Sequence, residues 1–265
     1  MIKVLVNADD YGFDENRTKA ILDAYRMGLV TTTTAMVNMP WFERAVKMAK
    51  GTKLYENIGL HLNLTEGMPI TKRIRKFSRF CNPEGTFNAV FHRGAWSRLC
   101  LSRGEQLAMA EEAEAQMEKY LSAQLPLMHL DSHHHSHTDF AVAKVILPIA
   151  KRLGFMSIRR SRDIGMKLTL GKFLYKGIVN RMMGHAVGFR TNHFGSVDDF
   201  ERVRAELPRN AIVEVMVHPL FRERDHLSLN GVFYDGNYGT NLIVDRKRYF
   251  EAIKDMCRLC NYKEI

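Results

Sequence analysis

The stretch VLVNADDYG, residues 4–12, decides the fold prediction, because an apolar run there ends in two adjacent carboxylates. Such a run is typical of a buried strand in a parallel sheet, with its acidic end opening into a site. Asp9 and Asp10 repel each other, which raises the pKa of at least one of them. We therefore expect a positive charge beside the pair, supplied by some other part of the chain.

Strand-like and helix-like stretches alternate along the sequence. Predicted strands cover residues 2–8, 31–39, 57–64, 127–131, 155–159 and 211–218, and predicted helices cover residues 15–27, 40–50, 105–123, 140–153 and 246–260. This alternation implies βαβ units and a largely parallel sheet, which is the α/β class. At least six such units favour a closed or nearly closed (β/α) barrel. We expect one domain, residues 1–265, with irregular insertions near residues 66–103 and 162–190.

Composition narrows the class of partner. The net charge is +10, from 39 Lys and Arg against 29 Asp and Glu. The basic residues are spread out, and no zinc-finger, helix-turn-helix or ribonucleoprotein pattern is present, so we expect no nucleic-acid partner. The charge indicates either a solvated basic surface or attraction for an anionic substrate such as a sugar phosphate. No run of 18 apolar residues and no signal peptide is found, which predicts a cytoplasmic protein without a membrane span.

Two further features have structural interpretations. Cys257 and Cys260 form a C-x-x-C near the end of the last predicted helix, where reduced core or surface thiols are favoured over a zinc or redox site. The segment 162–190 mixes apolar and basic residues. We interpret it as a helical insertion that covers the barrel mouth or forms a homodimer surface around Leu168–Val187, in preference to a membrane-surface helix.

Acidic and imidazole side chains follow several predicted strands. Those at strand ends are Asp9, Asp10, His61, Asp131, His133, His135 and His218. Because the carboxyl ends of parallel strands converge on one face, these groups predict a divalent metal site. The cation would let the acidic pair stay ionised, and a carboxylate outside the ligand set would take a proton from water. A single histidine at a strand end is usually structural, so the prediction rests on their joint occurrence.

Five motifs together resemble a known family. VNADDYG (6–12), TTTTAMVN (31–38), IGLHLNLTEG (58–67), HLDSHHHSH (129–137) and VEVMVHP (213–219) have the order and spacing of the YdjC-type carbohydrate deacetylases, distant relatives of the NodB-type polysaccharide deacetylases. The resemblance extends from residue 2 to about residue 219. It is weakest in the two insertions, and it implies a distorted (β/α) barrel. The segment 220–245 has no family signature, which leaves the substrate undetermined.

The resemblance also implies roles for individual residues. Carried over by motif, the metal ligands are Asp10, His61 and His133. Asp9 resembles the catalytic base and His218 the general acid. Arg159, after the fifth strand, resembles an arginine that pairs with Asp9 or with the substrate.

Three more residues, Asn63, Asp131 and His135, are expected to bind substrate or to orient the ligands. The ligand set alone does not name the metal: Mg, Zn, Mn and Co all remain open. The function so predicted is metal-dependent removal of the N-acetyl group from an amino sugar or short chito-oligosaccharide, phosphorylated or not, with release of acetate. Two alternatives remain: a sugar-phosphate phosphoester hydrolase and a non-catalytic carbohydrate-binding protein.

Overall fold

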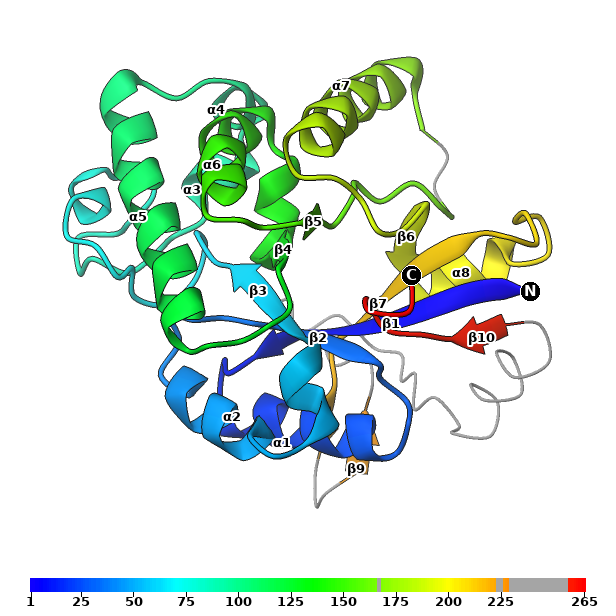
Figure 1. Cartoon of the computed structure of the whole chain (residues 1–265). Coiled ribbons are helices and arrows are strands. Elements are labelled where there is room, and N and C mark those ends of the chain that lie inside the picture. The colour runs from blue at the N-terminus through cyan, green and yellow to red at the C-terminus, as the bar shows by residue number, and fades with distance from the viewer. Residues whose placement is uncertain (166–167, 223–225, 229–256) are drawn as a thin grey trace.

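A curled, largely parallel sheet forms the centre of the protein, and helices cover its outer side (Figure 1). The computed structural model describes residues 1–165, 168–222, 226–228 and 257–265. Its strands are β1 (Ile2–Tyr11), β2 (Thr32–Ala35), β3 (Ile58–Leu62), β4 (His129–Ser132), β5 (Ser157–Ile158), β6 (His193–Ser196), β7 (Ile212–Val217), β8 (Leu220–Arg222), β9 (His226–Ser228) and β10 (Cys257–Leu259). The sheet follows the order β5-β4-β3-β2-β1-β7-β6 as a half-barrel, which confirms the predicted distorted (β/α) architecture.

Strand β1 is the central element of this sheet. It pairs with β7 along one side, and on the other side with β10 near its start and β2 near its end. The apolar residues of its middle have no exposed surface, as expected for a strand covered on both faces. All pairings within the large sheet are parallel. The carboxyl ends of its strands therefore face the same way.

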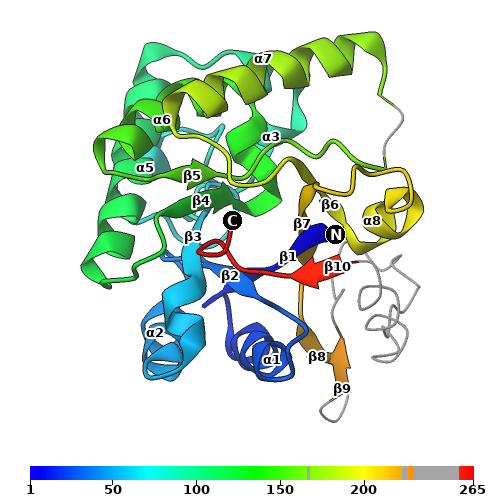
Figure 2. The same cartoon turned by 45° about the vertical axis from the view of Figure 1, so that its right-hand side comes forward.

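The helices lie around the curled sheet (Figure 2). They are α1 (Glu15–Arg26), α2 (Phe42–Ala49), α3 (Val90–Arg93), α4 (Ala95–Leu99), α5 (Arg103–Ser122), α6 (Phe140–Arg152), α7 (Leu170–Ala186) and α8 (Val197–Val203), with 3-10 turns η1 (Lys53–Asn57), η2 (Ile74–Lys76) and η3 (His133–Thr138). Local sequence sets several of their ends. Asp14 caps α1 by accepting the Arg17 N–H, and Ser102 with Glu105 forms a capping box at α5.

The two insertions have different structures. Residues 66–103 contain η2, α3 and α4, all of them short. Residues 162–190 contain α7, as the helical interpretation predicted, and the Tyr175 hydroxyl of this helix accepts the Phe140 N–H at the start of α6. Leu170, Phe173 and Leu174 of α7 are exposed. Whether this helix serves the barrel mouth or a dimer remains a prediction.

The predicted last helix is wrong at its end. Cys257–Leu259 is strand β10, paired in parallel with Ile2–Val4, while residues 246–256 lie outside the described residues. Cys260 directly follows β10, and its N–H still donates to the Val4 carbonyl of β1. In extended chain, residues three apart face opposite sides. Cys257 accordingly packs in the main core, and Cys260 packs with Leu5 and Tyr262. Both are free, buried thiols, so the core-thiol interpretation stands although the helix behind it does not.

Strand β6 and helix α8 were not predicted. The segment around Phe194 is short and has little apolar content, and it becomes a strand because β7 offers a parallel edge. Ser196 then begins α8 through a capping box with Asp199. Among the described helices, none combines the length and the apolar character that crossing a membrane would require.

Candidate metal centre

A break in strand β1 brings the two adjacent carboxylates to the same site. Consecutive strand residues normally face opposite sides of a sheet. The pairing of β1 with β2 shifts register between Ala8 and Tyr11, and Asp10 has a φ of +71°. Aspartate tolerates this left-handed conformation better than most residues. The bulge turns Asp10 toward two histidines, whereas Asp9 stays against an arginine. The two adjacent carboxylates therefore have separate partners.

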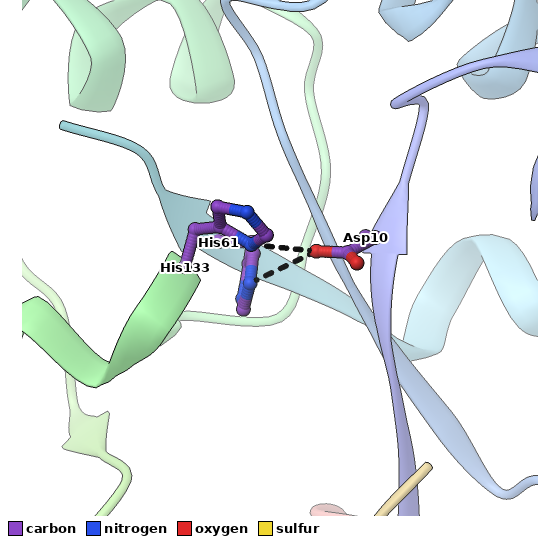
Figure 3. A group of neighbouring side chains, drawn as sticks. All are labelled: Asp10, His61 and His133. Carbon is purple, nitrogen blue, oxygen red and sulfur yellow. Dashed lines mark ion pairs between the residues drawn. The ribbon is translucent and has the colours of Figure 1, made fainter. Parts of the chain in front are cut away.

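Asp10, His61 and His133 form a compact donor cluster (Figure 3). Asp10 Oδ1 lies 3.3 Å from His61 Nε2 and 2.9 Å from His133 Nδ1. The three side chains come from the ends of β1 and β3 and from the start of η3, and all are buried. The structure thus brings together the three residues that the family resemblance assigned as metal ligands.

The chemistry of this cluster fits a divalent cation. One carboxylate and two imidazoles are a donor set that several divalent metals accept. Asp10 Oδ1 is buried and accepts no hydrogen bond of good geometry from the described residues. Burial disfavours charge on the imidazoles, but Asp131 and Asp10 outweigh it and raise the pKa of His61 to about 10. Against the same burial, Asp10 raises the pKa of His133 to about 9. The site therefore attracts positive charge.

Asp131 orients His61 from behind. Its Oδ1 lies 2.6 Å from His61 Nδ1, and its Oδ2 accepts a hydrogen bond from the Thr34 hydroxyl at 3.0 Å. A carboxylate on the distal nitrogen of a metal-binding histidine fixes the ring and its tautomer. His61 Nε2 is thereby left to face Asp10, so Asp131 lies where the orienting role predicted for it requires.

Arg159 clamps Asp9 at the base of the site. Its Nη1 donates to Asp9 Oδ2 at 2.8 Å and its Nη2 to Asp9 Oδ1 at 2.7 Å, and both residues are buried. Burial alone would raise the pKa of Asp9, but the guanidinium more than offsets it and holds that pKa below its usual value. Asp9 is therefore ionised at neutral pH. The pairing of Arg159 with Asp9 is one of the two alternatives that the resemblance left open.

His218 also lies near the Asp9 carboxylate. It follows β7, and its Nε2 is 3.9 Å from Asp9 Oδ2. Its side chain is 20% exposed, against 2% for Asp9, so it faces the accessible side of the site. Burial lowers the pKa of His218 below its ordinary value. A neutral imidazole there can take up a proton as well as return one.

The three consecutive histidines, residues 133–135, have different surroundings. His134 and His135 both have left-handed φ values, 54° and 56°. The His134 ring still packs against the His133 ring, with centroids 4.0 Å apart, but neither His134 nor His135 joins the cluster of Asp10. His135 packs edge-on against Phe194 at 5.5 Å, and its Nδ1 is buried without a hydrogen bond among the described residues. His134 Nδ1 instead pairs with Thr65 Oγ1 at 3.0 Å. Of the three, His133 alone joins Asp10.

Asn63 braces the loop that follows β3. Its Oδ1 accepts the backbone N–H groups of Thr65 and Glu66, and its Nδ2 donates to the carbonyl of Glu66. These contacts shape the rim of the site. Substrate contact by Asn63 remains a prediction.

Two carboxylates at the site were missed by the sequence analysis. Glu66 Oε1 lies 3.7 Å from His133 Nε2 and 3.8 Å from His134 Nε2, and these three residues form a second group able to hold a metal. Glu214 Oε1 accepts a hydrogen bond from Arg159 Nε at 2.6 Å inside the sheet. A charged residue within the apolar run IVEVMV was a usable signal for Glu214, because such a group needs a buried partner.

Comparison with known proteins adds an independent observation. The family model of YdjC-like proteins matches residues 3–248. A carbohydrate deacetylase of Brevibacillus brevis is 30% identical over 253 residues, covering 92% of this chain and 90% of its own. A carbohydrate deacetylase of Vibrio cholerae O1 (Classical Ogawa 395) is 36% identical over 222 residues, covering 83% of this chain and 79% of its own.

A solved structure shows the same fold. It is a protein of Enterococcus faecalis V583 to which cellobiose-phosphate cleavage has been provisionally ascribed. Its TM-score is 0.72 at 20% identity, and the match covers 99% of this chain and 98% of that one.

Proposed function

This chain belongs to the family of YdjC-like proteins, and we propose that it is a metal-dependent carbohydrate deacetylase that removes an N-acetyl group from an amino sugar or a short chito-oligosaccharide. The observation that carries the proposal is the geometry around Asp9. An ionised carboxylate and an imidazole, 3.9 Å apart, lie beside a buried cluster with the donors of a divalent ion.

The cluster of Asp10, His61 and His133 would hold the ion. A divalent ion bound there supplies a Lewis acid for the acetyl carbonyl and lowers the pKa of a nearby water. Imidazole ligands favour Zn or Co, whereas the carboxylate also admits Mg or Mn. The experiment below compares these four metals.

The remaining residues of the site move and hold protons. Asp9 accepts a proton from the attacking water, and Arg159 keeps this carboxylate ionised and oriented. His218 protonates the leaving amine, which is otherwise a poor leaving group. Because the pKa of His218 is lowered, it starts neutral and gains its proton during the reaction. The source is the proton that Asp9 takes from water, since Asp9 Oδ2 lies 3.9 Å from His218 Nε2. Asp131 holds His61 in one orientation throughout.

Acetate release tests this proposal. N-acetylglucosamine and short chito-oligosaccharides, each with and without a 6-phosphate, are incubated with Mg, Zn, Mn or Co, and again with chelator. We expect acetate release from at least one substrate, abolished by chelator and restored by metal. Inorganic phosphate is measured in the same reactions. Phosphate release without acetate would overturn the proposal in favour of a phosphoester hydrolase, and release of neither, with metal bound, would overturn the deacetylase assignment for these substrates.

A further inference from the structure

Glu214 is a fully buried carboxylate in the middle of β7. Its neighbours across the sheet are Leu5 on β1 and Phe194 on β6, in direct register. A carboxylate in such a position is costly unless a cation pairs with it. Its Oε1 accepts the Arg159 Nε–H, whereas its Oε2 is buried without a hydrogen bond among the described residues.

The guanidinium of Arg159 is held on every side. Both of its Nη atoms bind Asp9, and Nη2 also lies 2.7 Å from Asp131 Oδ2. The Phe194 ring lies 4.7 Å from the guanidinium carbon. The Nε–H lies on the far side of the planar group from the fork that grips Asp9. Glu214 is the acceptor at that end.

A hydrogen bond that holds Arg159 Nε also fixes the direction of its two Nη groups. The guanidinium is planar, so a strong charge-assisted hydrogen bond at Nε limits its rotation and sets the direction of both Nη donors. Those donors are the contacts that place Asp9 between the metal-binding cluster and His218. A shift of about 1 Å in a reacting group can cost on the order of 10² in rate.

We propose that Glu214 is a positioning residue for the deacetylation: by holding Arg159 Nε, it fixes the guanidinium plane and so the place of the Asp9 carboxylate beside the Asp10, His61 and His133 cluster. This inference rests on the proposed function. Glu214 acts through Arg159 and need not touch the substrate. It ties β7 to the residue that directly follows β5, and these two strands are far apart in the order of the sheet.

Two substitutions at this position separate positioning from burial. Glu214→Gln keeps an acceptor for Arg159 Nε and removes the charge, whereas Glu214→Leu removes the acceptor. We expect E214L to lower kcat by on the order of 10² with KM nearly unchanged, because only the placement of the base is affected. E214Q should recover most of kcat. Rates are expressed per folded, metal-loaded molecule.

A matched control is available in Glu112. It is equally buried, but its carboxylate accepts hydrogen bonds from the N–H groups of Ile70 and Thr71 and from Gln116 Nε2, and among the described residues it has no hydrogen bond with Arg159 or Asp9. E112L should lower the thermal midpoint, as E214L does, and leave kcat unchanged. Equal kcat values for E214L and E112L in an active protein would overturn the positioning role.

A second measurement does not depend on activity. The ¹H–¹⁵N resonance of Arg159 Nε, assigned from its loss in R159K, reports its hydrogen bond directly. We expect it to move and lose protection from solvent exchange in E214L and to stay in place in E112L. An unchanged resonance in E214L would overturn the inference. If the wild type released no acetate, the proposed function would fail, and this resonance would still decide whether Glu214 holds Arg159.

Discussion

Replacing Arg159 by methionine removes a fully buried guanidinium that contacts three carboxylates. Those contacts are the two hydrogen bonds to Asp9, the 2.7 Å contact with Asp131 and the 2.6 Å bond to Glu214. Breaking one buried ion pair from one side costs about 3–5 kcal/mol, because the other charge stays buried. With three partners left behind, we expect R159M to lose about 5 kcal/mol of unfolding free energy. Typical proteins have only about 5–15 kcal/mol in total.

The pH dependence of this loss has a definite sign. In the wild type, burial raises the pKa of Asp9 but Arg159 brings it below 3.8, so Asp9 contributes stability above pH 3.8 that is lost as the pH falls. In R159M, only the weaker attractions of His61 and His218 oppose burial, so we expect the folded-state pKa of Asp9 to lie above 3.8. Its stability is then full below pH 3.8 and declines as the pH rises through the new pKa. The gap between the two proteins should widen from pH 4 to pH 8.

Thermal unfolding over that pH range measures both effects. At about 2–4 °C per kcal/mol for a chain of this size, R159M should unfold roughly 10–20 °C below the wild type at pH 7. R159K keeps the charge but cannot form the bidentate pair with Asp9, so its unfolding midpoint should lie between those of R159M and the wild type. The control is R152M: Arg152 is 55% exposed and pairs with Glu114 at the surface, where such a pair is worth about 0–1 kcal/mol. A midpoint for R159M within the range of R152M, or a gap that narrows with rising pH, would refute the reasoning.

Three further predictions concern the site and its surroundings. Asp9→Asn should keep metal binding, measured by metal content, and lower kcat by about 10²–10⁴ because the base is removed; the control Asp23→Asn, at an exposed pair with Arg26, should not. His61→Ala should lose metal and acetate release together, and metal retained at the wild-type content would contradict the ligand assignment. The pKa of His137 is lowered to about 3 by burial and by Arg159, so this neutral ring contributes stability above pH 6.5 that is lost as the pH falls toward 3. Between pH 7.5 and 5 the loss is roughly 2 kcal/mol, and the unfolding midpoint of His137→Gln should therefore fall less steeply over that interval than that of the wild type.

The alternation of strands and helices was enough to predict the parallel sheet. Strand β7 and the first part of β1 are mainly apolar, as expected for strands of a parallel sheet that are buried on both faces. Strand β6 could not be predicted, because it becomes a strand through its pairing with β7 and its own composition gives no strand signal. The end of the predicted last helix was wrong for a similar reason. The short run at Cys257 pairs with β1, and periodicity cannot separate a strand from a helix over so few residues.

The site residues that follow apolar strands could be predicted from the sequence. The residues whose side-chain direction depends on a backbone turn could not. His61 and His218 follow apolar strands, so their convergence was expected. The bulge that turns Asp10 away from Asp9 has no signal in the sequence beyond the acidic pair itself. Likewise, the left-handed turn at His134 and His135 decides which of three identical residues joins the cluster.

Charge balance explains how so many buried acids can share one region. Four carboxylates are buried in this region: Asp9, Asp131 and Glu214 contact Arg159, and Asp10 lies against His61 and His133. Burial raises the pKa of Glu214 to about 7 even beside Arg159, so this group sheds part of the negative charge near neutral pH. The two histidines of the cluster carry protons that offset the remainder. A divalent ion would bring two positive charges in place of those two protons, leaving the balance as it was.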